Sequence, residues 1–69
     1  MEDDPYILSL KRRINVEPQN GELRLLMASA LLDRKRVKEA LSEVQIARQD
    51  PACRNKAMSL QRRILELLE

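Results

Sequence analysis

The fold is decided by residues 20–47, which read NGELRLLMASALLDRKRVKEALSEVQIA. In the first part of this stretch, apolar residues recur at spacings of three and four, the pattern of one face of an α-helix. Asn20 is a suitable N-cap for this helix, because its side chain can accept a backbone N–H of the first turn. The polar segment 33–36 then interrupts the pattern, which resumes at Val37 with Ala40, Leu41, Val44 and Ala47. The stretch predicts two helices, over residues 20–33 and 37–49, joined by a tight turn.

A further helix is predicted on each side of this pair. Asp4 followed by Pro5 indicates a helix start, and Pro18 ends that helix near residue 16 because the residue before a proline avoids helical geometry. Beyond Pro51, residues 52–68 carry an apolar stripe, formed by Cys53, Ala57, Leu60, Ile64 and Leu67 and widened towards the C-terminus by Met58, Leu65 and Leu68. Short connections make consecutive helices antiparallel. The sequence therefore predicts an all-α fold of four short antiparallel helices, over about 5–16, 20–33, 37–49 and 52–68.

The composition argues against an enzyme. The chain has 69 residues, enough for a single domain, with one cysteine and no histidine, so neither an internal disulfide nor a conventional zinc site is expected. Its single glycine rules out a glycine-rich phosphate loop. Cys53 lies beside Arg54 and Lys56, a setting that can activate a thiol, but we interpret it as a packed apolar side chain. We expect no catalytic activity, no cofactor, no metal and no small-molecule substrate.

Charge is nearly balanced, with 13 basic and 11 acidic residues and a net charge of +2. Basic residues cluster at 12–13, 34–36 and 62–63, but acidic residues are interspersed and no aromatic residue is placed to stack on bases. The acidic residues 2–4 are unlike a signal peptide, and no apolar run is long enough to span a membrane. We expect a cytoplasmic protein that does not bind membranes, and the charge pattern argues against a dedicated nucleic-acid binder. A single unpaired cysteine agrees with a reducing compartment.

The segment from Pro18 to Pro51 resembles a tetratricopeptide repeat (TPR). These prolines lie 33 residues apart, close to the family's 34-residue period. Small residues match the family's close helix contacts at Ala28, Ala40 and Ala47; large apolar residues match at Met27 and Leu31; and Lys38-Glu39-Ala40-Leu41 is similar to the usual start of the second helix. Lys35 replaces the family's glycine between the helices, and Val37 replaces a common aromatic residue. The resemblance implies a TPR-like hairpin, preceded by one helix and followed by a longer capping helix.

The resemblance also implies a binding surface. In such arrays the first helix of each repeat lines an inner groove that binds peptides or partner helices, and the matching residues here are Leu25, Ser29, Leu32 and Asp33. The alternative interpretation is that the first or last helix folds over Leu25 and Leu32 and makes them part of the core. The sequence leaves both interpretations open.

These features favour a protein–protein interaction module that recruits or assembles partners through an apolar helix face. We expect it to form the N-terminal part of a larger protein, because it begins with Met1 and ends within an apolar periodic run. Its organisation resembles the N-terminal accessory domains of some AAA-type ATPases. One alternative is a homo-oligomerisation domain, in which the apolar stripe pairs with a second copy. A weak nucleic-acid-binding domain that uses the arginine pairs is the remaining alternative.

Overall fold

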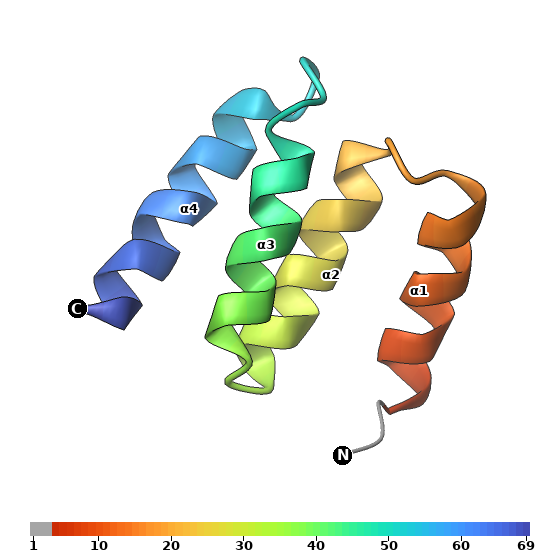
Figure 1. The fold of residues 1–69 in the computed structure, drawn as a ribbon, viewed down its shortest axis with the longest axis horizontal. Coiled ribbons are helices and arrows are strands. Elements are labelled where there is room, and N and C mark those ends of the chain that lie inside the picture. The colour runs from red at the N-terminus through yellow and green to blue at the C-terminus, as the bar shows by residue number, and fades with distance from the viewer. Residues whose placement is uncertain (1–3) are drawn as a thin grey trace.

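In the computed structural model, residues 4–69 form four α-helices and no strand. The acidic residues Glu2 and Asp3 lie outside this described part. The helices are α1 (Pro5–Val16), α2 (Gly21–Asp33), α3 (Val37–Ala47) and α4 (Arg54–Leu68). Figure 1 shows them side by side in chain order, with consecutive helices antiparallel. The molecule is flat, with extents of 28 × 27 × 12 Å. The predicted all-α fold of four antiparallel helices is confirmed.

The starts of α1 and α2 are fixed by the predicted caps. The Asp4 carboxylate accepts the backbone N–H of Ile7 at 3.0 Å, and the Asn20 side chain accepts that of Leu23 at 3.3 Å. Each bond satisfies one of the backbone donors that a helix leaves without an internal partner at its N-terminus. Both predicted N-caps are confirmed.

The connection between α3 and α4 is longer than predicted. Helix α3 ends at Ala47 rather than residue 49, and α4 begins at Arg54 rather than residue 52. Asp50 is the reason, since its side chain accepts the N–H of Ala52 at 3.0 Å and its carbonyl accepts that of Cys53 at 2.9 Å. Such local bonds compete with the helical ladder and favour a turn.

Asp50 also joins this turn to the start of α2. Its carboxylate accepts the N–H of Gly21 at 3.0 Å across 29 residues of sequence. A Cβ atom on Gly21 would lie 2.8 Å from the Asp50 Cβ and 2.9 Å from the Cys53 sulfur. Real Cβ atoms do not approach other atoms this closely, so position 21 needs glycine because of space.

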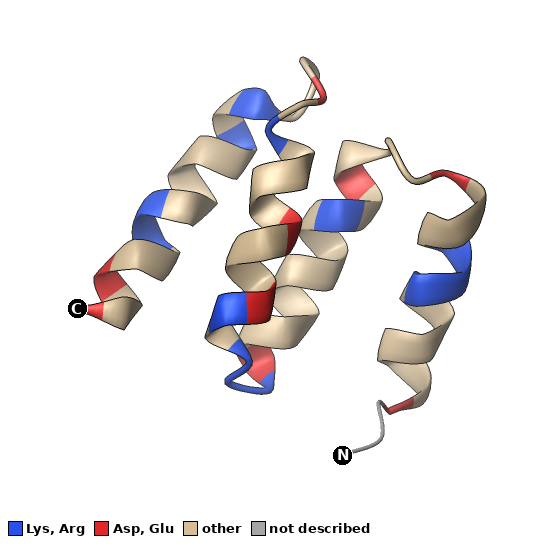
Figure 2. Cartoon of the chain, in the orientation of Figure 1, with Lys and Arg blue, Asp and Glu red and all other residues tan. Residues whose placement is uncertain are grey.

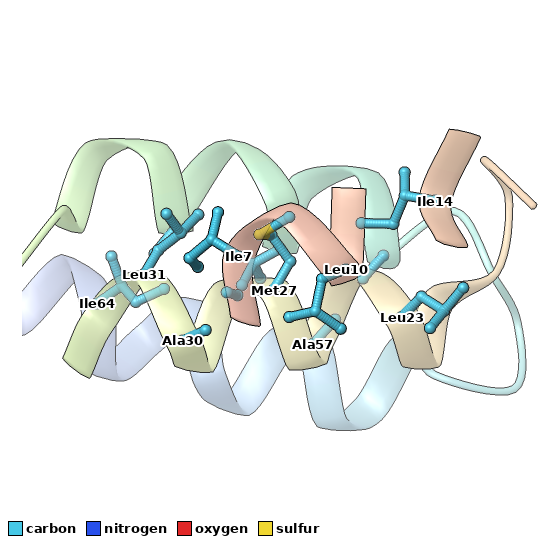
Figure 3. Close-up of a cluster of buried hydrophobic side chains, with 13 residues drawn as sticks. Ile7, Leu10, Ile14, Leu23, Met27, Ala30, Leu31, Ala57 and Ile64 are labelled. Atoms are coloured by element: carbon cyan, nitrogen blue, oxygen red, sulfur yellow. The ribbon is translucent and has the colours of Figure 1, made fainter. Parts of the chain in front are cut away.

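The core runs through all four helices (Figure 3). Helix α2 lies between α1 and α3, which accounts for its wide apolar surface. The three alanines of the repeat pattern have no exposed surface, as close helix contacts require. The buried core consists of Ile7, Leu10, Ile14, Leu23, Met27, Ala28, Ala30, Leu31, Ala40, Val44, Ala47, Ala57 and Ile64.

Candidate partner-binding site

A hollow of about 320 Å³ lies between the C-terminal halves of α2 and α4. Three leucines give it an apolar lining, and one serine, one acidic and one basic side chain complete it. The lining residues are Ser29, Leu32 and Asp33 from α2 and Leu60, Arg63 and Leu67 from α4. A concave apolar surface with a few polar groups is the usual character of a binding site.

Helical spacing explains why these residues meet. On α2, Ser29, Leu32 and Asp33 are three and four residues apart, so they share one side of the helix. On α4, Leu60, Arg63 and Leu67 share one side for the same reason. Ala57 and Ile64 of α4 point into the core. The side with Leu60, Arg63 and Leu67 lies next to them on the helix, where the core meets solvent.

Three of the four predicted site residues are brought together here, and the fourth is not. Leu25 lies outside the hollow and is half-buried, packed against the core. Leu32 is also half-buried against the core but contributes to the hollow. The two leucines are therefore not equivalent: one is mainly a packing residue and the other forms the floor of a surface site.

The contribution of α4 to this site was missed in the sequence analysis. The apolar residues predicted to form one widening stripe over 52–68 do not pack as one surface, because Leu67 is 65% exposed whereas Ala57 and Ile64 are fully buried. The signal was present in the sequence: apolar residues cover about half of the circumference of α4, which is wider than one packed neighbour can bury.

A second hollow, of about 480 Å³, lies over α2 between α1 and α3. Its floor includes Met27 and Leu31, but its wall is charged. Arg24 donates to the Glu43 carboxylate at 3.0 Å across the α2–α3 contact, and Arg36 pairs with Glu39 at 2.6 Å. These groups already satisfy one another, so this hollow offers fewer free contacts for a ligand than the α2–α4 hollow.

Cys53 is a packed residue, as interpreted from the sequence. Its side chain is 1% exposed, and its thiol donates to the carboxylates of Glu22 at 3.5 Å and Asp50 at 3.8 Å. Burial raises the pKa of the Cys53 thiol, and the two carboxylates raise it further. A raised pKa keeps the sulfur protonated, so the thiol lacks the activation that the basic sequence neighbours suggested.

The basic side chains are distributed over the helices rather than collected on one of them (Figure 2). Arg12 and Arg13 lie on α1, while Arg62 and Arg63 lie on α4 at the other edge of the molecule. In the turn between α2 and α3, Arg34 pairs with Asp4 and Arg36 with Glu39. The three basic clusters of the sequence therefore do not form one continuous patch.

Residues 4–69 contain no group of three or more histidine, cysteine or acidic side chains that could hold a metal ion. None of the helices in that range combines the length and apolar character needed to cross a membrane. Comparison of the chain with known protein families, curated proteins and solved structures gives no match. What the α2–α4 hollow can bind is set by its own chemistry: three leucines, a serine and two opposite charges.

Proposed function

We propose that this protein is an interaction module that binds an amphipathic helix of a partner protein in the α2–α4 hollow. The observation that carries the proposal is the convergence of Leu32, Leu60 and Leu67 from two helices on one surface depression. Leucine side chains held partly in water gain free energy when a partner covers them, by about 25 cal/mol per Å² of apolar surface.

The size and charges of the hollow define the partner more closely. Its volume of about 320 Å³ is at the lower end of the range for ligand sites, roughly 300–1,000 Å³. It suits one or two apolar side chains rather than a whole peptide. Asp33 and Arg63 are both exposed, so a partner helix with one basic and one acidic residue beside its apolar anchors would complement them.

The resemblance to TPR motifs supports the same surface. In such arrays the first helix of each repeat lines the binding groove, and the resemblance assigns α2 and α4 to those positions. The turn after α2 adds a second point of agreement. Lys35, which stands where the family has glycine, has φ 62°, a left-handed conformation that favours glycine.

A peptide selection tests the proposal. Helical peptides are selected from a displayed library against the 69-residue chain, and the best binder is titrated into ¹⁵N-labelled protein. We expect the selected peptide to carry apolar residues at helical spacing and to shift the amide signals around Ser29, Leu32, Arg63 and Leu67. Leu67→Asp should weaken binding at least about tenfold, a loss of about 1.4 kcal/mol.

Leu65→Asp is the matched control, because it makes the same change on the same helix, two residues away and outside the hollow. It should leave peptide affinity unchanged. The proposal would be overturned if Leu67→Asp bound the peptide as well as the unmodified chain, or if the shifted signals surrounded the α1–α3 hollow instead.

A further inference from the structure

The other flank of α4 carries a second row of exposed apolar side chains. Met58 and Leu65 are 48% and 44% exposed, and helical spacing places them with Gln61 on the side away from Leu60 and Leu67. A hollow of about 410 Å³ follows this flank, lined by Arg48, Met58, Gln61, Arg62, Leu65, Glu66 and Glu69. We call Met58, Gln61 and Leu65 the outer flank of α4.

A comparison of α4 with α2 indicates what kind of partner fits the outer flank. Residues that lie 34 positions apart have similar burial: Leu23 matches Ala57, and Ala30 matches Ile64, and all four are buried. By the same offset, Met27 and Leu31 match Gln61 and Leu65. On α2 these two positions are 3% exposed, because they lie between α1 and α3.

On α4 the equivalent surface has a neighbour on one side only. Helix α3 is packed beside it, and Figure 1 shows α4 at the edge of the molecule with no described helix beyond. The surface is thus shaped to receive a helix that lies antiparallel to α4, as α3 lies antiparallel to α2. Such a helix must be apolar at its centre to cover Met58 and Leu65.

The charges of α4 restrict the partner further. Helical spacing places Arg54 at the start of the outer flank and Glu69, the residue after α4, at its end. Lys56, which pairs with Glu22, and Arg63, which lines the α2–α4 hollow, lie on the other side of the helix. An antiparallel partner therefore needs acidic residues opposite the start of α4 and basic residues opposite its end. Helix α4 itself has this charge order, together with the required apolar centre.

We propose that two copies of the protein associate through the outer flanks of their α4 helices, antiparallel and related by a twofold axis. Met58 of one copy then faces Leu65 of the second copy, and Arg54 faces Glu69. The Arg48 guanidinium, which donates to the Gln61 side chain at 3.1 Å, lies beside the centre of the flank. Every contact occurs twice, as an interface between two identical surfaces requires.

The association is weak, because each copy contributes only two half-exposed apolar side chains. The area that they bury is far below the roughly 800 Å² per partner of a standard interface. We expect a dissociation constant on the order of 100 µM, within the range of transient contacts. This surface is separate from the α2–α4 hollow, so the two proposals can fail independently.

Sedimentation equilibrium over a range of concentrations tests the proposal. The apparent mass should rise from 8.0 kDa towards twice that value as the concentration increases. Leu65→Asp should raise the dissociation constant at least about tenfold, and Leu67→Asp, the same change on the other flank, should leave it unchanged. A mass that stays at 8.0 kDa at millimolar concentration, or a dimer lost in Leu67→Asp but kept in Leu65→Asp, overturns the proposal.

A charge reversal tests the antiparallel arrangement. It avoids replacing an apolar side chain by an acidic one, a change that could weaken the dimer by disturbing the fold. Glu69→Lys places a positive charge opposite Arg54 of the second copy and should weaken the dimer. Adding Arg54→Glu to the same chain restores opposite charges across the interface and should recover the original dissociation constant. In a parallel dimer, residue 54 would face residue 54 of the second copy and residue 69 would face residue 69. The second substitution would then leave like charges opposite each other and would not restore the dissociation constant. That result would overturn the proposal.

Discussion

Lys35 adopts a conformation that costs free energy for any residue with a side chain. Its φ of 62° places it in the left-handed region at the end of α2, where its N–H donates to the Leu32 carbonyl. The next N–H, that of Arg36, donates to the Leu31 carbonyl, and both bonds are 2.9 Å long. This is the Schellman arrangement, which satisfies the last carbonyls of a helix and is usually built with glycine.

We predict that Lys35→Gly stabilises the protein by about 0.5–1 kcal/mol, because glycine adopts this conformation without a steric penalty. The increase should be visible as a higher urea midpoint with an unchanged slope. Lys35→Ala is the control, since alanine removes the charge and the long side chain but keeps the Cβ atom. Equal midpoints for the glycine and alanine variants would show that the conformation is not the source of the change.

At the scale of helices, α1 is tied to α2 by an ion pair at its N-terminus. Asp4 both caps α1 and accepts from the Arg34 guanidinium at the end of α2. Arg34 also donates to the Ala30 carbonyl at 2.7 Å and lies 5.8 Å from the centre of the Tyr6 ring. One arginine therefore links the end of α2 to both the cap and the first turn of α1.

This link makes stability depend on pH. The hydrogen bond from Arg34, followed by that from the Ile7 N–H, lowers the pKa of Asp4 below its ordinary value of 3.8. Between the lowered pKa and the ordinary one, the unfolded chain binds more protons than the folded chain. The stabilisation is therefore complete above the ordinary value and is lost as pH falls through the lowered pKa.

We predict that Asp4→Asn makes the free energy of unfolding less dependent on pH below about pH 4, because asparagine can still cap the helix but cannot ionise. Urea denaturation at a series of acidic pH values measures this slope for both proteins. The Asp4 side chain is 38% exposed, so added salt should reduce the difference between them. Parallel pH curves for the two proteins would contradict the assigned role of Asp4.

Local signals explain which elements could be predicted from the sequence. The start of α1 and the start of α2 depend on Asp4 and Asn20, whose side chains bond within three residues, and the end of α1 depends on Pro18. The two helix ends on either side of the Asp50 turn were each predicted two residues away from their observed position. Pro51 signals an interruption in the sequence, but it does not show that the Asp50 side chain bonds to the Ala52 N–H and lengthens the turn.

The candidate site was less predictable for a different reason. Ser29, Leu32 and Asp33 could be placed on one side of α2 by their spacing, but whether Leu25 joined them depended on packing against other helices. Helix α4 has apolar residues on three adjacent rows. Which row becomes core is decided by where α2 and α3 lie, and the spacing within α4 alone contains no such information.

At the scale of the whole molecule, stability should vary across the layer of helices. Helix α2 has a packed neighbour on each side, whereas α1 packs against α2 through Ile7, Leu10 and Ile14 and forms one edge of the layer. In such a nearest-neighbour arrangement an edge helix can open while the others stay folded.

We predict that native-state hydrogen exchange protects the amides of α2 and α3 more than those of α1. Leu10→Ala should enlarge the difference, because Leu10 is 1% exposed and truncating a buried leucine costs about 2–5 kcal/mol. Protection in α3 should change much less than protection in α1. An equal fall in all four helices would show instead that the molecule unfolds as one cooperative unit.

The contact between Gly21 and Asp50 gives the chain a recognisable signature. Glycine at the first position of α2 leaves space for the aspartate 29 residues later, and the aspartate in turn accepts the glycine N–H. Position 21 cannot gain a side chain without a clash, and position 50 needs a short side chain with an acceptor oxygen to keep the bond, so in related chains the two positions should vary together. A search for Asn-Gly followed at this spacing by Asp-Pro would therefore find relatives whose other residues have diverged.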